Sequence, residues 1–203
     1  MNAQVLVSGR DATTSVACWE GEVIAAITVE VIKKEMEEGP SSVVRLIDHP
    51  EISQSTEKIV RRLGLSGLFG FDFILEEHSN CATLIEMNAR ATQISHLALG
   101  THRDLPAALS AVVGGEPFPE TQPVSDRDVI ALFPQEWHSD PASEYLATAF
   151  HDVPWREPRL VKACVDFYTA QKKWHSSRRL VDLYRKISTS PFLHHPVKPV
   201  GRP

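Results

Sequence analysis

The stretch that decides the fold runs from Gly67 to Gly100 and reads GLFGFDFILEEHSNCATLIEMNARATQISHLALG. Residues 67–75 and 82–88 favour β-strands, because both segments are rich in aromatic and branched apolar side chains. The polar residues 76–81 between them are typical of a connecting turn. We therefore expect two neighbouring strands that pair as a hairpin.

Alternation along these two strands places three oxygen-bearing side chains on one face. Asp72 lies between two phenylalanines, so its carboxylate and the two rings point to opposite faces. Glu86 and Asn88 share a face by the same rule, and a paired hairpin sets them across from Asp72. Two carboxylates and an amide oxygen suit Mg²⁺ bound together with substrate phosphates, and do not suit zinc or a soft metal.

Arg90 follows two residues after Asn88, where the second strand runs out. A guanidinium at that point can hold a phosphate oxygen in a forked geometry. The same alternation of polar residues is also typical of the wet face of a half-buried sheet. The spacing alone therefore suggests a metal and phosphate site and leaves an ordinary solvated face open.

Outside the hairpin, the chain reads as strands followed by helices. Alternating and β-branched segments predict further strands at 4–7, 14–19, 23–32, 42–47 and 129–133. Glu20, Gly21 and Glu22 suit a tight turn between the second and third of these. Helical spacing predicts helices over 50–65, 95–99 and 105–113. Hairpins without regular βαβ units indicate an α+β domain built on a mainly antiparallel sheet.

The composition excludes several classes of protein. With 203 residues, 42% hydrophobic and 23% charged, the chain is neither collagen-like nor a disulfide scaffold. Its net charge of −5 argues against a nucleic-acid partner held through phosphates. No apolar run reaches the length of a membrane span, and residues 1–20 lack a secretory signal. The three cysteines lie far apart, so we expect a reducing cytoplasm, with Cys18 and Cys81 inert in apolar surroundings.

The run GFDFIL…LIEMNAR resembles the metal-binding hairpin of the ATP-grasp superfamily, in which a strand with an acid or Gln precedes a strand reading E-x-N-x-R. The wider sequence is similar to the ATP-grasp domains of carbamoyl-phosphate synthase large subunit and biotin carboxylase. AQVLVSG at 3–9, VACWEGEVIAAITVEV at 16–31 and GPSSVVR at 39–45 carry this likeness. It covers about residues 4–115 and implies the C-terminal lobe of an ATP-grasp fold.

The resemblance implies ATP and Mg²⁺ as cofactors, with Mn²⁺ as an alternative ion. Asp72, Glu86 and Asn88 would then ligate a metal that bridges the ATP phosphates. Arg90 would stabilise those phosphates or an acylphosphate intermediate, which makes it the catalytic candidate. In the implied reaction ATP phosphorylates a small carboxylate or bicarbonate, and an amine displaces the phosphate.

The resemblance also implies an adenine contact and a substrate contact. The backbone of the strand at 4–7 would touch adenine, which makes Gln4, Val5 and Val7 candidates for nucleotide binding. Arg45, just after the GPSSVV segment, would face the substrate. Of the other polar residues, we expect His96 to pack or cap a helix in preference to contacting the substrate. We expect residues 135–137 to pack after a strand in preference to lining a pocket.

The chain departs from the family at its N-terminus. An ATP-grasp fold holds ATP between two lobes, yet this sequence starts close before the hinge and shows no glycine-rich phosphate loop. We expect residues 1–115 to form the C-terminal lobe, 116–168 a family-specific extension, and 169–203 a basic, partly disordered tail with a short helix at 176–187.

Two hypotheses remain open for the function. The chain is either the metal-bearing half of an ATP-dependent carbon–nitrogen ligase that needs a complementing N-terminal lobe, or a non-catalytic remnant that serves as an interaction module.

Overall fold

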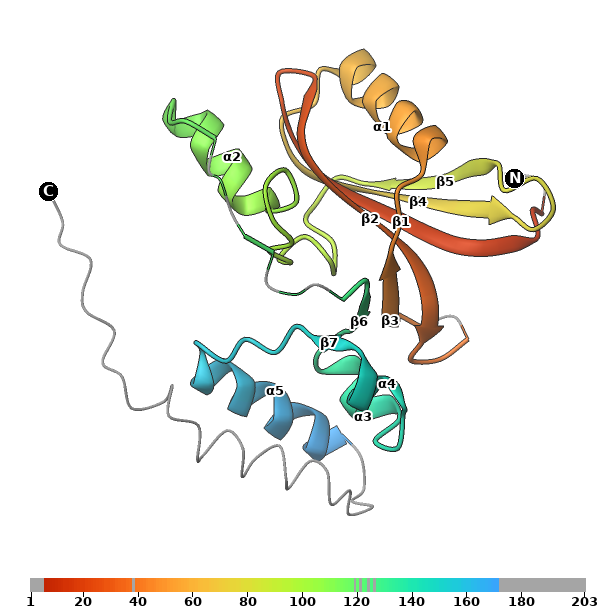
Figure 1. Ribbon diagram of the computed structural model, residues 1–203, viewed down its shortest axis with the longest axis vertical. Coiled ribbons are helices and arrows are strands. Elements are labelled where there is room, and N and C mark those ends of the chain that lie inside the picture. Colours follow the sequence, from red (N-terminus) through yellow and green to blue (C-terminus); the bar gives the residue numbers. More distant parts are fainter. Residues whose placement is uncertain are drawn as a thin grey trace, which may run out of the picture.

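The computed structural model describes residues 6–37, 39–118, 120, 122–123, 125 and 127–171, the last four by their backbone alone. The described chain forms one seven-stranded sheet in the order β5-β4-β1-β2-β3-β6-β7 (Figure 1). The strands are β1 (Gly9–Trp19), β2 (Glu22–Lys34), β3 (Ser41–Leu46), β4 (Gly67–Glu76), β5 (Ala82–Asn88), β6 (Val129–Ala131) and β7 (Phe150–His151). All neighbouring strands are antiparallel except β6 and β7, so the predicted α+β class and mainly antiparallel sheet are confirmed.

Five helices accompany the sheet: α1 (Pro50–Leu63), α2 (Leu105–Gly114), α3 (Gln135–Ser139), α4 (Tyr145–Thr148) and α5 (Pro158–Gln171). Helix α1 starts with a proline, whose fixed φ suits the first turn, and ends at Gly64 in the left-handed conformation. Helix α2 begins after Asp104, whose side chain accepts a hydrogen bond from the backbone N–H of Ala107 at 3.1 Å. None of the described helices is long and apolar enough to cross a membrane.

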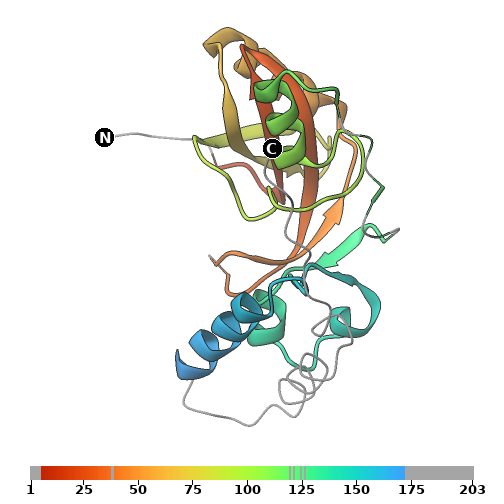
Figure 2. The ribbon, with the colours of Figure 1, turned by 90° about the vertical axis from the view of Figure 1, so that its left-hand side faces the viewer.

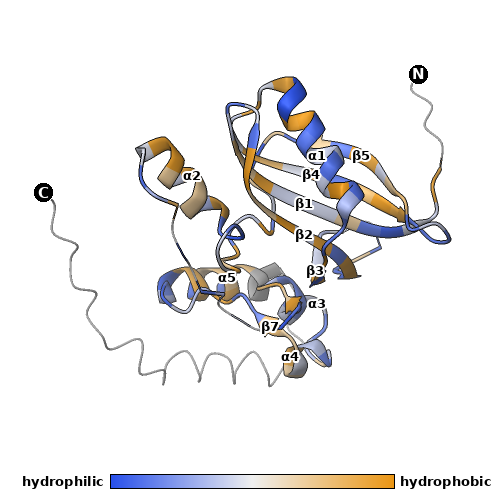
Figure 3. Ribbon diagram, turned by 45° about the horizontal axis from the view of Figure 1, so that its top comes forward, coloured by the Kyte–Doolittle hydropathy of each residue, from blue (hydrophilic) through white to orange (hydrophobic). Residues whose placement is uncertain are grey.

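Two apolar cores lie on opposite faces of the sheet. One lies under α1, where Ile52 and Val60 pack against β4 residues such as Phe71 and Phe73. The other lies under α2, where Leu105 and Ala108 pack against β2, β3 and β6. Figure 3 shows hydrophilic and hydrophobic colour alternating along α1, as expected for a helix with one buried face.

The segment after residue 116 continues the same sheet. Strand β6 pairs with β3, and β7 pairs with β6, so this segment adds two strands beyond the predicted lobe. Figure 2 shows β2 and β3 running from the part of the molecule with α1 and α2 to the part with α3, α4 and α5. Helices α3, α4 and α5 have no counterpart in the sequence-based expectation.

The expected helix at 95–99 is wrong. Residues 93–96 form turns, and Ala98 and Leu99 make isolated bridges to Asp104 and Pro123. The segment is held in this form because Ile94, Leu97 and Leu99 all reach the core under α2. Tertiary burial here outweighs a weak local helical pattern.

Two further expectations fail near the ends of the described chain. The strand expected at 4–7 is wrong for Leu6 and Val7, because β4 ends opposite Gly9 and offers them no partner. Gln4 and Val5 lie outside the described residues, as does the helix expected at 176–187. Apolar surroundings were expected for both Cys18 and Cys81. Cys18 is buried as expected, whereas Cys81 is exposed just before β5.

Candidate functional site

The β4–β5 hairpin brings Asp72, Glu86 and Asn88 together, and we call these three residues the oxygen cluster. Asp72 lies directly across the ladder from Glu86. The Asn88 amide nitrogen donates to Asp72 Oδ2 at 2.9 Å and to Glu86 Oε1 at 3.0 Å. The expected convergence of the three side chains on one face is therefore confirmed by their contacts.

A β-bulge in β5 sets this arrangement. Asp72 pairs with Glu86 while the next residue of β4, Phe73, pairs with Leu84, so Ile85 is the extra residue. A bulge restarts the alternation of side chains on the strand that carries it. Glu86 and Asn88 consequently share the face of Asp72, and Leu84 lies across from a core phenylalanine.

The electrostatics of the cluster favour a cation. Burial raises the pKa of Asp72, the Thr13 hydroxyl lowers it, and the adjacent carboxylate of Glu86 raises it again, so that the net shift is upward. The nearby carboxylate of Glu86 thus adds to the cost of ionising Asp72. A divalent cation would remove that penalty, because it attracts both carboxylates at once.

The donor set fits a hard ion that brings other ligands with it. Among the described residues, no group of three His, Cys, Asp or Glu side chains is placed to hold a metal. The oxygen cluster offers two carboxylates and one amide, which is the partial set typical of Mg²⁺ bound through substrate phosphates.

The cluster lines one end of a cavity of about 740 Å³ on the sheet face that also carries α2. Arg90 stands beside it in the wall, exposed, with Nη1 donating to the Ala91 carbonyl at 3.3 Å. Arg90 and the three oxygen-bearing side chains therefore line the same cavity.

The loop that follows β5 lies against the sheet, and its Thr92 packs directly on Gly70 of β4. A Cβ at this position would lie 2.2 Å from Thr92 Cγ2, so only glycine allows the close approach. Thr92 in turn shares a hydrogen bond with the Ser15 hydroxyl of β1. Gln93 Nε2 donates to the Ser41 carbonyl at 2.8 Å, which ties the same loop to β3.

Arg45 does not face this cavity, contrary to expectation. It pairs across the ladder with Glu30, which pairs in turn with Ala12 of the core under α1. Its guanidinium lies 3.9 Å from the Glu30 carboxylate. Because Asp72 pairs with Thr13, the next residue of β1, Arg45 and the oxygen cluster are on opposite faces.

The cavity wall also contains residues that sequence reasoning missed or set aside. Lys34 of β2 forms an ion pair there with Asp11 of β1. Gln135 of α3 reaches the wall from the C-terminal segment, although the sequence favoured packing for residues 135–137. No motif marks Asp11 or Lys34, since only the pairing of β1 with β2 places them together.

The comparisons with known proteins concern the first part of the chain. Residues 2–93 match the model of a family described as the ATP-grasp domain. No curated protein matches the chain. The resemblance drawn from the hairpin motif is confirmed over the matched residues.

Several solved structures resemble the chain at low identity. N5-carboxyaminoimidazole synthase from Aspergillus clavatus is 17% identical, with 54% of this chain and 31% of its own covered at a TM-score of 0.38. The ATPase subunit of phosphoribosylaminoimidazole carboxylase from Aquifex aeolicus is 17% identical. The match covers 59% of this chain and 37% of that structure, with a TM-score of 0.43. L-amino acid ligase from Bacillus licheniformis is 14% identical. The match covers 57% of this chain and 34% of that structure, with a TM-score of 0.42. The chain thus matches about a third of the length of these structures.

Proposed function

We propose, starting from an ATP-grasp domain in residues 2–93, that this chain supplies the metal-bearing half of an ATP-dependent carbon–nitrogen ligase. Its cofactors would be ATP and Mg²⁺ or Mn²⁺, and its substrates a small carboxylate and an amine. The observation that carries this proposal is the oxygen cluster beside Arg90 at one end of the cavity.

Each residue of the site has a role that follows from its position. Asp72, Glu86 and the Asn88 amide oxygen would hold the ion, and the Asn88 amide nitrogen donates to both carboxylates. Arg90 would donate to an oxygen of the transferred phosphoryl group. When bound, the ion would neutralise negative charge that develops on that group.

Nucleotide contacts through Gln4, Val5 and Val7 remain part of this proposal. Val7 is described and lies two residues before β1, the strand whose Thr13 pairs with Asp72. A complementing lobe would cover the nucleotide from the other side. The three cysteines form no disulfide, which supports a cytoplasmic location as the environment of the reaction.

Binding of Mg²⁺-ATP by calorimetry tests the proposal. We expect Glu86→Gln to weaken Mg²⁺-dependent binding by at least about tenfold, because loss of one carboxylate removes a ligand and leaves Asp72 alone. Glu57→Gln on the exposed face of α1 is the matched control and should bind as the wild type does. Equal affinities for wild type and Glu86→Gln, or no Mg²⁺-dependent binding by the wild type, would overturn the proposal and favour the interaction module.

A further inference from the structure

Helix α5 carries apolar side chains on two of its faces. Val161 and Val165 are buried, so one face is covered by the rest of the chain. Leu160 and Phe167 are 51% and 59% exposed, and Ala163 between them is exposed as well. The spacing i, i+3 and i+7 puts these three exposed residues on one side of the helix, largely opposite the two valines. We call them the outer stripe.

The outer stripe is available to a partner at the end of the molecule. Apolar side chains gathered on one exposed face are typical of a surface that makes a contact. Figure 2 shows α5 at the end of the molecule away from α1 and α2. Helix α5 ends at Gln171, and residues 172–203 follow it in the sequence. Those residues are the nearest to the outer stripe along the chain, so they are the first candidates to cover it.

The sequence soon after α5 contains an apolar face of the same kind. Residues 176–187 lie outside the described residues and read SSRRLVDLYRKI. Helical spacing would put four large side chains on one face, namely Leu180, Leu183, Tyr184 and Ile187. The charged residues of the segment would then occupy the other side: Arg178, Arg179, Asp182, Arg185 and Lys186. A helix divided in this way packs its apolar face against a partner and turns its charged face to water.

The two apolar faces match in spacing when the chain reverses direction between them. Phe167 lies five residues before the connecting residues 172–175, and Leu180 lies five residues after them. Leu160 and Ile187 are each twelve residues from the same connection. Antiparallel helices joined there would therefore set Phe167 level with Leu180, and Leu160 level with Ile187.

The lengths of the two segments and of their connection also agree. A connection of four residues falls within the range of about 2–8 that joins antiparallel helices. With a rise of about 1.5 Å per residue, α5 and a helix over 176–187 would each be about 20 Å long. One helix can thus cover the whole outer stripe of the other.

We propose that residues 176–187 form a helix that packs antiparallel on α5 and covers the outer stripe. The basic part of the chain then begins with an ordered element, and its cations form one surface on the side away from α5. The inference is independent of the proposed function, because α5 contributes no residue to the wall of the cavity.

The native thiol of Cys164 reports whether the outer stripe is covered. Cys164 lies beside the stripe on α5, is partly buried, and would be level with Leu183 of the proposed helix. In the full chain, Leu180→Gln with Leu183→Gln should speed the modification of Cys164 by a thiol reagent at least about tenfold, because the covering helix would detach. Exposed Cys81 is the internal reference, and its rate should stay the same.

A matched control keeps the new side chains and changes only the face. Arg179→Gln with Arg185→Gln places the same two glutamines on the charged face, so Cys164 should react there at the wild-type rate. A wild-type rate for Cys164 in Leu180→Gln with Leu183→Gln, or equal acceleration in both double variants, would overturn the proposal.

Disulfide cross-linking identifies what covers the stripe. In a chain with Cys81→Ser and Cys164→Ser, the pair Leu160→Cys and Ile187→Cys should form a disulfide within one chain under a mild oxidant. The control pair Leu160→Cys and Arg185→Cys should remain reduced, because position 185 would face away from α5. A disulfide between two chains would show that a second copy covers the stripe. That outcome, equal cross-linking of both pairs, or no cross-link in either would overturn the inference.

Discussion

Asp72 shows at the level of one residue how the candidate site trades stability for function. Its carboxylate is partly buried beside that of Glu86, and its pKa is raised above the ordinary value of 3.8, mainly by burial. An acid whose pKa is higher in the folded chain than in the unfolded chain costs stability when it is ionised. That cost is present at neutral pH and disappears as the pH falls through the folded pKa towards 3.8.

Asp72→Asn is therefore expected to stabilise the chain in the absence of metal. The gain should be about 0.5–1 kcal/mol at pH 7, or about 2 °C in Tm for a chain of this length, and should shrink in acid. Thermal unfolding followed at pH 7 and pH 4 measures both effects. Asp48→Asn, at a side chain that is 89% exposed, is the control and should bring no such gain. A loss of stability in Asp72→Asn at pH 7 would contradict the argument.

Gly70 is the second residue on which the site depends, since it lets the loop with Arg90 cross the sheet. Gly70→Ala should cost about 1–3 kcal/mol, because the new methyl would meet Thr92 Cγ2 at 2.2 Å. Adding Thr92→Ser should recover most of the loss, because serine lacks that methyl and keeps the hydroxyl that Ser15 contacts. Urea unfolding measures the three variants.

Gly114→Ala is the control for this pair. Gly114 ends α2, and the nearest atom to an added Cβ is Glu116 Cγ at 3.5 Å. Alanine there should be neutral or stabilising by up to about 1 kcal/mol. Equal effects at positions 70 and 114 would mean that the loop contact is not what requires Gly70.

At the scale of elements, two neighbouring lysines of β2 join different parts of the fold. Lys34 pairs with Asp11 within the cavity, whereas Lys33 pairs with Glu136 of α3, which is fully buried. Burial lowers the pKa of Lys33, but its hydrogen bonds to Asp140 and Glu136 outweigh burial and raise the pKa overall. The contact therefore fastens α3 to the β2–β3 hairpin through one buried acid.

Lys33→Met should destabilise the chain by about 3 kcal/mol, because it leaves the Glu136 carboxylate buried without a cation. Lys34→Met is the matched comparison and should cost less than about 1 kcal/mol, since its pair is solvated. Replacing both Lys33 and Glu136 by apolar residues should restore much of the loss. Chemical denaturation of the four proteins checks the order, and equal losses for both lysines would contradict it.

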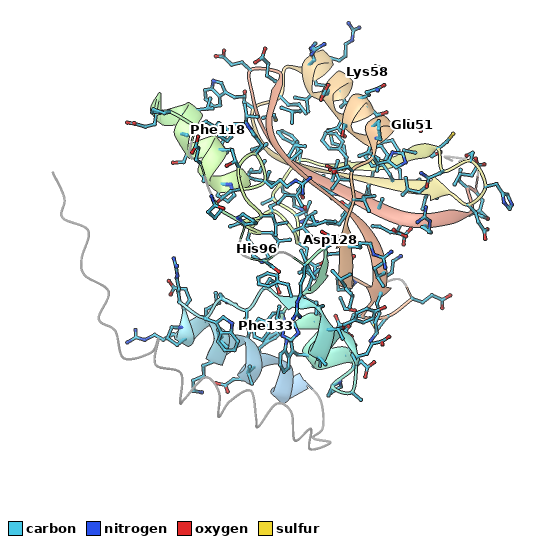
Figure 4. All side chains as sticks on the ribbon, viewed as in Figure 1. Glu51, Lys58, His96, Phe118, Asp128 and Phe133 are labelled. Carbon is cyan, nitrogen blue, oxygen red and sulfur yellow. The ribbon has the colours of Figure 1, made fainter. Side chains whose placement is uncertain are left out.

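At the scale of the whole molecule, the C-terminal segment and the loop after β5 meet at His96 and Asp152. His96 Nε2 lies 3.0 Å from Asp152 Oδ2, and the other Asp152 oxygen accepts from the Phe133 backbone N–H. Figure 4 shows His96 and Phe133 close to each other where the two parts of the molecule adjoin. The hydrogen bond to Asp152 raises the pKa of His96 above its ordinary value.

The sign of this shift predicts a pH dependence. A histidine whose pKa is raised on folding stabilises the folded chain below its unfolded value of about 6.5, and the gain is lost as the pH rises through the folded pKa. His96→Gln should therefore cost about 0.5–1 kcal/mol at pH 5.5 and little at pH 9, a figure kept small because His96 is 58% exposed. His78→Gln in the exposed β4–β5 turn is the control, and an identical pH profile for both variants would refute the assignment.

Much of the molecule could be predicted from the sequence where local chemistry is strong. The turn at Glu20 and Gly21, both at positive φ, follows from short-range propensity. The start and stop of α1 follow from Pro50 and Gly64 for the same reason. Alternation within a strand also predicted that Asp72 faces Glu86 and Asn88.

What could not be predicted depends on which distant segments pair. The bulge at Ile85, the side of the sheet that Arg45 occupies, and the meeting of Lys34 with Asp11 all follow from strand register. Register is fixed by tertiary packing and leaves no local signal in one sequence. Short elements such as α3 have the same limitation, because Glu136 is held by a lysine about a hundred positions earlier in the chain.

Strand β5 ends the order of the described sheet, so the strand that carries Glu86 and Asn88 has a ladder of hydrogen bonds on one flank only. An edge strand is displaced more readily than an interior strand, because the backbone of an interior strand is hydrogen-bonded on both sides. The two parts of the cavity wall therefore differ in restraint: Asp11 and Lys34 belong to interior strands, whereas Glu86 belongs to an edge strand. We expect a ligand bound in the cavity to shift β5 more than β1 or β2, because β5 is hydrogen-bonded along one side only.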